Sequence, residues 1–249
     1  MTLLGLIFAL LIGLSLGLLG AGGSIVTVPV FTYVLGYPAK SAIAMTLPVV
    51  AVACAVGALS HWREGRVKLD VALRFGLVAV LTSFAAARFS PRVSAETQLA
   101  ILGFVILAGA SSMFRPPPLE GAERRAPRPA WVVVLAGALV GVLTGLAGVG
   151  GGFVIVPALV LLARLPMKEA VGTSLAVIVM NTAAGFVGYV GLVDIDWMLL
   201  LPFTAVAVIG TLIGTRLVSH VPVGALRRGF AVLLVAIGVL VLWQSGVAG

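Results

Sequence analysis

The feature that most constrains this chain is a glycine-rich phrase that occurs twice inside apolar sequence. "GLLGAGGSIVTVP" occupies residues 17–29 and "GLAGVGGGFVIVP" occupies residues 145–157, so the copies lie 128 residues apart. Chance agreement between apolar stretches would match Leu, Val and Ala, whereas this offset also matches proline, phenylalanine and arginine. The further pairs are Pro38 with Pro166, Phe75 with Phe203, and Arg88 with Arg216. We interpret the chain as a tandem duplication.

The proportions of apolar and charged residues indicate whether water or lipid surrounds this protein. Of the 249 residues, 61% are hydrophobic and 10% are charged, whereas a soluble domain carries about 25% charged residues. No soluble fold of this size has enough interior for so much apolar surface. The sequence therefore predicts an all-α polytopic membrane protein.

Apolar segments divide the chain into two halves around one polar stretch. "RPPPLEGAERRAPRPA", at residues 115–130, is rich in proline and charge, which is typical of a solvated linker. We predict an N-terminal transmembrane repeat over 1–114, a cytoplasmic linker over 115–130 and a C-terminal repeat over 131–249. The apolar segments lie near 3–20, 24–36, 41–60, 71–87, 98–114, 131–149, 153–163, 170–193, 197–215 and 229–244. They predict about 8 to 10 transmembrane or half-membrane helices.

The distribution of Lys and Arg indicates whether the chain continues across the membrane at each glycine cluster or folds back there. If each cluster lies within one continuous span, the 16 basic residues divide evenly between the two sides of the membrane. If the chain folds back there, 13 lie on one side and three (Lys40, Arg88 and Arg92) on the other. Cytoplasmic loops carry the excess of Lys and Arg, so we predict a helix break at each cluster. The halves then insert as inverted repeats, with a cytoplasmic linker and both termini outside.

The glycine clusters are the first candidate substrate site. A half-helix that begins at a break has unpaired N-terminal amides with partial positive charge, and such amides bind anions. The alternative is close packing of helices through small residues. The candidate substrate-binding residues in the clusters are Gly22, Gly23, Ser24, Gly150, Gly151 and Gly152.

Small polar residues within the apolar segments extend this candidate site. Thr46 aligns with Ser174 at the repeat offset, Thr173 precedes Ser174, and Asn181 follows it by seven residues. Seven residues make two helical turns, so Ser174 and Asn181 share one face. These side chains are expected to donate hydrogen bonds to a substrate oxygen, and the alternative is hydrogen bonding between helices.

Four basic residues are candidates for attracting an anion to the site. Arg88 and Arg216 end equivalent apolar segments, while Lys40 and Lys168 follow equivalent prolines. The alternative for all four is snorkelling of a helix-end side chain to the membrane surface. All eight Asp and Glu residues lie in or beside expected loops. The chain therefore lacks the usual intramembrane carboxylate relay, which favours a neutral or anionic substrate over a cation.

Several other chemistries are disfavoured by composition. The two histidines, His61 and His220, and the single Cys54 are too few for a metal cluster with ordinary spacing. We expect no metal and no cofactor. The net charge of +8 is scattered between apolar segments, so it fits membrane orientation and not nucleic-acid binding. The expected partners are the lipid bilayer and a small anionic substrate.

The motifs and their order resemble one family of membrane proteins. The duplicated glycine phrase, "AIAMTLPVV", "AVGTSLAVI", "GALSHWREGRVKLD" and "GTRLVSHVPVGALRRGFAVLL" are similar to the TauE/SafE sulfite exporter family. The resemblance covers nearly the whole chain apart from the linker. It implies an inner-membrane permease for sulfite, sulfoacetate or related sulfur-containing organic anions.

The leading hypothesis is therefore a transporter, not an enzyme, that moves a small anion through a cavity between two inverted halves. One alternative is an intramembrane enzyme that acts on a lipid phosphate, for which His61 and His220 are the available acid–base groups. Another is a membrane scaffold that transports nothing. Flux measurements with a panel of anions separate these hypotheses.

Overall fold

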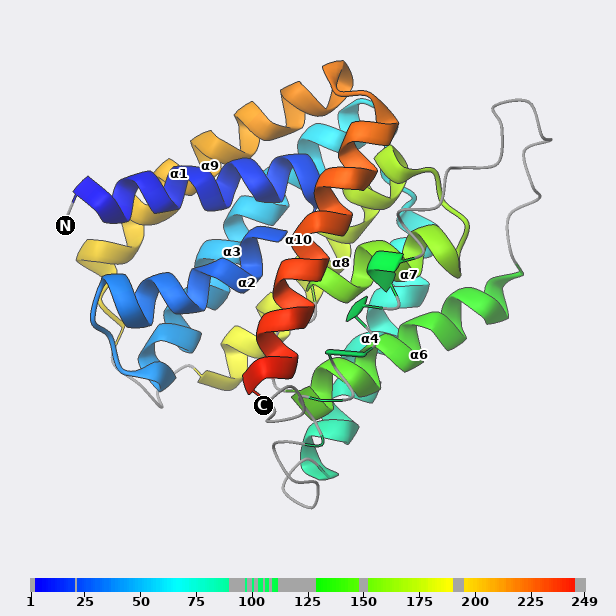
Figure 1. Cartoon of the computed structure of the whole chain (residues 1–249), viewed down its shortest axis with the longest axis horizontal. Helices are drawn as coiled ribbons and strands as arrows, with labels where there is room; N and C mark the ends of the chain where they lie inside the picture. The colour runs from blue at the N-terminus through cyan, green and yellow to red at the C-terminus, as the bar shows by residue number, and fades with distance from the viewer. Residues whose placement is uncertain are drawn as a thin grey trace.

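The structure, a computed structural model, describes residues 3–20, 22–89, 129–147, 152–189 and 195–244, with nine single positions between 97 and 111. The elements within the described residues are all helical, as predicted (Figure 1). They are α1 (Leu3–Leu19), α2 (Gly22–Pro29), a π-helical turn (Val30–Val34), α3 (Ala39–Arg63), α4 (Leu69–Phe89), α6 (Ala130–Ala147), α7 (Gly152–Leu161), α8 (Met167–Tyr189), α9 (Trp197–His220) and α10 (Val223–Gln244).

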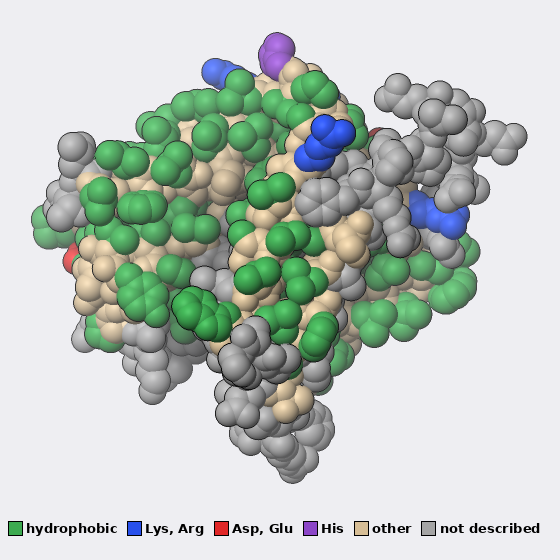
Figure 2. Space-filling model, viewed as in Figure 1, with side chains coloured by type: hydrophobic (Ala, Val, Ile, Leu, Met, Phe, Trp, Pro, Cys, Tyr) green, Lys and Arg blue, Asp and Glu red, His purple; other side chains and the backbone are tan. Residues whose placement is uncertain are grey.

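Four of these helices are long and apolar enough to cross a membrane. The candidate spans are Ser41–Arg63, Leu69–Ala86, Met167–Val187 and Trp197–His220, and Leu4–Leu19 and Ala130–Leu143 are shorter apolar helices. Apolar side chains cover much of the outer surface seen in Figure 2. This exposed apolar surface fits a chain whose solvent is lipid, so the protein is a multi-pass membrane protein.

The order of the helices repeats at the offset found in the sequence. α3 and α8 begin at Ala39 and Met167, and α4 and α9 begin at Leu69 and Trp197. Both pairs of starts are 128 residues apart. α1 and α6, and then α2 and α7, correspond in the same way within a few residues. The duplicated sequence therefore builds the same run of helices twice.

Helices from different halves form the closest pairs. α1 runs beside α9, and α6 runs beside α4 (Figure 1). A methyl group on Gly13 would overlap the carbonyl oxygen of Ala207, and one on Gly141 would overlap that of Ala79. These two contacts are equivalent under the repeat, because each residue lies 128 positions from its counterpart. The halves thus interlock, and α3 packs against α8 between them.

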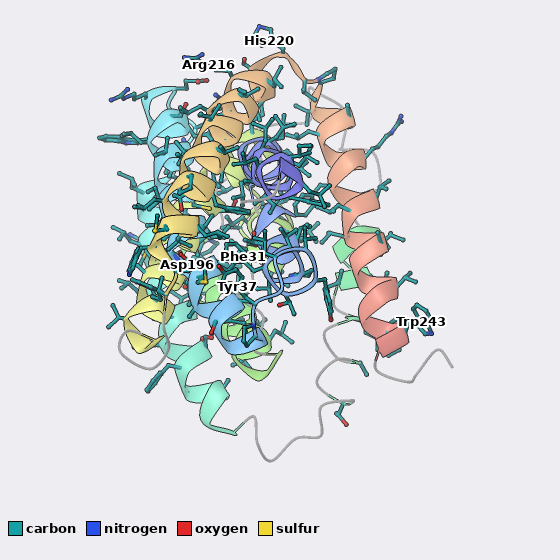
Figure 3. All side chains as sticks on the ribbon, turned by 90° about the vertical axis from the view of Figure 1, so that its left-hand side faces the viewer. Phe31, Tyr37, Asp196, Arg216, His220 and Trp243 are labelled. Atoms are coloured by element: carbon teal, nitrogen blue, oxygen red, sulfur yellow. The ribbon has the colours of Figure 1, made fainter. Side chains whose placement is uncertain are left out.

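Two hydrogen bonds define one end of the helix bundle, which we call the basic end. The Lys68 amide donates to Thr173 Oγ1 at 3.0 Å, and Lys168 Nζ donates to the Ser219 carbonyl at 3.2 Å. The starts of α4 and α8 therefore lie beside the end of α9. At the opposite end, Tyr37 Oη donates to Asp196 Oδ2 at 2.6 Å, which brings the start of α3 to the start of α9 (Figure 3). Repeat-equivalent α4 and α9 consequently begin at opposite ends.

Exposed tryptophans mark both ends. Trp62 lies in the last turn of α3, and Trp131 in the first turn of α6, which runs parallel to α4 from the basic end. Trp197 and Trp243 lie at the opposite end, at the start of α9 and the end of α10. Tryptophan rings gather at both membrane–water boundaries. Their placement fits helices that cross the bilayer from one end of the bundle to the other.

The predicted break at the first glycine cluster is present. α1 ends at Leu19 and α2 begins at Gly22, and Gly20 adopts a left-handed backbone with φ of 80°. A methyl group on Gly23 would overlap the carbonyl oxygen of Ile12 in α1. Because Ile12 lies well before the break, α2 turns back along α1. In the second half, α6 ends at Ala147 and α7 begins at Gly152, and residues 148–151 lie outside the described part.

Candidate functional site

The first glycine break lies where α1, α3 and α8 meet. A methyl group on Gly20 would come within 2.5 Å of Ser174 Oγ and 2.9 Å of the Val171 carbonyl oxygen. Ser174 Oγ also lies 3.4 Å from the Gly20 carbonyl oxygen. Val171 and Ser174 belong to the first two turns of α8, which start at the basic end. The break is therefore enclosed by protein at the basic end of the bundle.

The amides that follow this break belong to a short helix, α2, whose second residue Gly23 is buried. α2 has eight residues and continues into the π-helical turn. The first amides of any helix lack carbonyl partners in that helix and carry partial positive charge. Gly23 is buried against α1 and Ser24 is half-buried. Gly22, Gly23 and Ser24 form the start of α2, and their role in binding substrate stays a prediction.

The turn between α3 and α4 covers the start of α8. Thr173 is fully buried, and its hydroxyl oxygen accepts the Lys68 amide. A methyl group on Gly172 would lie 2.8 Å from the Arg66 carbonyl oxygen and 2.9 Å from His61 Cβ. Thr173 therefore anchors this turn, and Gly172 lets the turn approach α8 closely.

The hydroxyl protons of the predicted threonine and serine donors are already used within their own helices. Thr46 Oγ1 donates to the Ala42 carbonyl, and Ser174 Oγ donates to the Val171 carbonyl, each at 2.8 Å. Both residues are buried. Such bonds back to the preceding turn are common for Ser and Thr in helices. In this geometry these two hydroxyls offer lone pairs to a neighbour, and their role in binding substrate stays a prediction.

Asn181 differs from these hydroxyls because its side-chain oxygen has no partner. Asn181 Oδ1 is buried and accepts no hydrogen bond among the described residues. One turn along the same helix, Gly185 lies within van der Waals reach of Leu47 in α3. Since α8 starts at the basic end, Asn181 and Thr46 lie in the opposite half of the bundle from Ser174. The predicted site residues therefore fall into two groups at different depths.

The four predicted anion-attracting residues do not converge. Arg216 is exposed in the last turns of α9, at the basic end (Figure 3). Lys168 lies at the same end, where its ammonium group donates to the Ser219 carbonyl. Arg88 and Lys40 lie on the last turn of α4 and the first turn of α3, at the opposite end, and their side chains are outside the description. Gly150 and Gly151 also lie outside the described residues, and Gly152 begins α7.

Two residues beside the first break were not predicted to bind substrate. His61 is fully buried, and its Nε2 lies 3.4 Å from the Gly17 carbonyl oxygen. Arg66 pairs with Glu64, and burial of the guanidinium lowers the pKa of Arg66. Both His61 Nδ1 and Arg66 Nε are buried without a hydrogen-bond partner among the described residues. The sequence signal for them was weak, because "HWREGR" at the end of an apolar segment also fits an ordinary solvated turn.

Comparisons with known proteins give consistent results. A family model described as "Sulfite exporter TauE/SafE" matches residues 5–241. A "Probable membrane transporter protein" of Xylella fastidiosa strain Temecula1 is 29% identical, over 94% of this chain and 92% of the relative. "Probable membrane transporter protein YdhB" of Bacillus subtilis is 26% identical, over 94% of this chain and 97% of the relative. No solved structure gives a significant match.

Proposed function

Because this chain belongs to the sulfite exporter TauE/SafE family of membrane transporters, we propose that it carries small anions across the plasma membrane. The substrate class is sulfite or sulfur-containing organic anions such as sulfoacetate. The family assignment makes the chain a transporter and sets aside the alternative of an intramembrane enzyme that acts on a lipid phosphate.

The observation that carries this proposal is the enclosed break at Gly20. At this break the left-handed Gly20 leads into the first turn of α2, where the amides of Gly22 and Gly23 carry partial positive charge. Amides at a helix start bind anions without a buried cation. They therefore suit a substrate that must be held briefly and released.

The placement of the acidic residues supports an anionic substrate. Among the described residues, the carboxylates are Glu64, Asp70, Glu169 and Asp196, and all four lie in turns or in the first turn of a helix. The described spans thus present no carboxylate to an anion that passes through the middle of the bundle. Intramembrane cation sites and proton relays usually rely on such carboxylates.

Transport would use the two halves as inverted repeats. In this proposal the basic end faces the cytoplasm, in keeping with the excess of Lys and Arg there. The linker at residues 115–130 would lie on the same side. The first break lies near the basic end, whereas α6 starts at the basic end and ends at Ala147, towards the opposite end. Rocking of one half against the other would then open the anion path to each side in turn.

Flux into proteoliposomes tests the proposal directly. The purified full chain is reconstituted, and uptake of sulfite, sulfate, sulfoacetate, taurine and short carboxylates is measured against empty liposomes. We expect saturable uptake of sulfite or sulfoacetate and little uptake of taurine, which has no net charge at neutral pH. If none of these anions enters faster than into empty liposomes, the chain is not an anion transporter, and a non-transporting scaffold becomes the better explanation.

A glycine variant at the break, compared with a control variant elsewhere, tests whether the break is part of the transport path. Gly23→Leu fills the space between α2 and α1, where even a methyl group would overlap the Ile12 carbonyl oxygen. We expect this variant to lose flux. Gly229→Ala in α10 is the matched control, because no atom lies within 4 Å of the added methyl. Equal flux through wild type and Gly23→Leu would remove the break from the transport path.

A further inference from the structure

Two buried polar atoms lie beside the first break, one in the last turn of α3 and one in the turn that follows α3. The described residues leave three buried side-chain nitrogen or oxygen atoms without a partner, and two of them are His61 Nδ1 and Arg66 Nε. The Arg66 amide donates to the His61 carbonyl at 2.9 Å, so the backbone ties the two residues together. An unpartnered buried polar atom costs about 1–3 kcal/mol. Both atoms can therefore hydrogen-bond to a ligand that reaches this part of the bundle.

The tautomer of His61 follows from its contact with α1. His61 Nε2 lies 3.4 Å from the Gly17 carbonyl oxygen, and a carbonyl oxygen only accepts. Nε2 therefore carries the proton, and Nδ1 of the neutral ring presents a lone pair. Arg66 Nε, by contrast, always presents an N–H. In the neutral state an anion near both atoms meets one donor and one repelling lone pair.

Protonation of His61 changes this balance. An imidazolium has an N–H at both nitrogens, so Nδ1 then becomes a hydrogen-bond donor, as Arg66 Nε–H already is. We propose that these two groups form a proton-dependent oxyanion site at the basic end, through which the protein carries a proton together with its anion. His61 takes one proton from the water at that end and gives it up again when the anion leaves. No bond within the anion is made or broken. This inference rests on the anion transport proposed above, and it adds that transport of the anion is coupled to transport of a proton.

The charged groups around His61 leave this site available to an external anion. In its own turn, Arg63 is exposed and Glu64 pairs with Arg66. On α8, Glu169 pairs with Lys68 at 3.7 Å. The other charged or titratable side chains described on the neighbouring elements are Asp70 and Arg74 on α4, Lys168 on α8, and Arg216 and His220 on α9. α1 contributes no ionisable side chain. Both nearby glutamates are thus engaged by cations.

Proton uptake on binding tests the proposal in the unaltered protein. Sulfoacetate is the probe, because its sulfonate and carboxylate both stay ionised above about pH 6, so any proton taken up belongs to the protein. Sulfoacetate is added to the purified full chain in weakly buffered detergent solution, and the pH is recorded. We expect uptake of up to one proton per anion bound. The apparent affinity should fall by up to about tenfold per pH unit above the pKa of His61. Anion binding without proton uptake would overturn the proposal.

His61→Gln separates proton binding from the structural contact of the ring. Gln has an amide N–H that can still reach the Gly17 carbonyl, but it does not titrate. We expect this variant to bind sulfoacetate without proton uptake, with an affinity independent of pH between about pH 6 and 8. His220→Gln is the matched control, because His220 is exposed at the same end of the bundle. Unchanged proton uptake in His61→Gln would overturn the proposal even if this variant transports normally.

Arg66→Lys tests the second donor. Lysine keeps the positive charge beside Glu64 but has no N–H at the position of Nε. We expect the apparent affinity for sulfoacetate to weaken by about tenfold, the effect of one lost hydrogen bond to an anion. Arg63→Lys, at an exposed position of the same turn, should bind as wild type does. An Arg66→Lys variant with wild-type affinity would remove Arg66 from the site.

The outcomes distinguish this inference from the function on which it rests. If liposomes with the protein take up sulfoacetate, and a pH dye inside them shows no proton entry with the anion, proton coupling fails and anion transport stands. If no anion in the panel is transported, the proposed function itself fails. Proton entry that depends on sulfoacetate and is lost in His61→Gln is the result expected here.

Discussion

At the scale of single residues, Asn181 offers the sharpest separation of a functional role from a structural one. Its buried Oδ1 has no partner among the described residues, and such a group costs about 1–3 kcal/mol. Asn181→Leu removes the unpartnered group and keeps the same branching and number of side-chain heavy atoms. We expect the variant to melt at a higher temperature and to transport anions more slowly. Thermal unfolding in detergent and flux in proteoliposomes measure the two effects.

Thr182 provides the control for this substitution. Thr182 is the next residue of α8, is buried, and donates its hydroxyl proton to the Ile178 carbonyl at 2.7 Å. Thr182→Val removes a hydroxyl whose proton is already used within the helix, so flux should stay at the wild-type level. A lower melting temperature together with wild-type flux in Asn181→Leu would instead mean that the amide holds the helices together and has no role in transport.

The hydrogen bond between Tyr37 and Asp196 leads to a prediction about pH. This bond lowers the pKa of Asp196 and raises that of Tyr37 to about 12. The contribution of Asp196 to stability is present above its unfolded pKa of about 3.9 and is lost as pH falls through its lower folded value. The contribution of Tyr37 is present below about pH 10 and is lost as pH rises through about 12. Between these limits the bond is unaffected by pH.

Tyr37→Phe should therefore destabilise the protein equally at about pH 6 and about pH 8. The loss of the bond should also increase amide hydrogen exchange at residues 35–37 and in the first turn of α9, which Asp196 caps. Tyr33→Phe is the control, because Tyr33 is 84% exposed. A loss of stability that varies between these two pH values would mean that another titrating group controls this contact.

At the scale of helices, the glycines of α1 and α6 determine how the two halves interlock. Gly13→Ala would place a methyl group on the Ala207 carbonyl oxygen, and backbone does not move as easily as a side chain. We expect a loss of about 2 kcal/mol in the free energy of unfolding, typical of an overpacked contact. Gly141→Ala should behave similarly, because its methyl would overlap the Ala79 carbonyl oxygen. Denaturant or thermal unfolding measures both.

Gly229→Ala in α10 sets the baseline for these substitutions. No atom lies within 4 Å of the added methyl, and Ala favours a helix over Gly by about 1 kcal/mol. This variant should be as stable as wild type or more stable. If Gly13→Ala is as stable to unfolding as Gly229→Ala, instead of less stable, then α1 is not packed against the backbone of α9.

Helices are also the scale at which the sequence predicts most of the fold. The 128-residue offset predicts the repeated helix order, and the glycine phrase predicts the break before Gly22. The pairing of α1 with α9 was beyond reach, because glycine spacing says that a neighbour comes close and does not say which helix it is. Likewise, the sequence identified Thr46 and Ser174 as polar, but only coordinates show that both donate to their own helices. The role of His61 depends on a contact with Gly17, 44 residues away.

At the scale of the whole molecule, membrane sidedness connects the charge pattern to the proposed transport cycle. Met198 and Asp70 are equivalent residues of the two halves, 128 positions apart. Both are exposed, in the first turns of α9 and α4. α4 begins at the basic end and α9 at the opposite end, so equivalent residues lie at opposite ends of the bundle. If the basic end faces the cytoplasm, Met198 faces outward and Asp70 inward.

Cysteine labelling in intact cells tests this orientation. Cys54 is fully buried and gives little background. We expect Met198→Cys to react with a membrane-impermeant maleimide in intact cells, whereas Asp70→Cys reacts only after the membrane is opened. His220→Cys, at the far end of the helix that Met198 begins, should behave like Asp70→Cys. The reverse pattern would place the basic end outside and contradict the charge argument. Labelling of both Met198→Cys and Asp70→Cys from one side would mean that α4 and α9 do not cross the membrane as this packing requires.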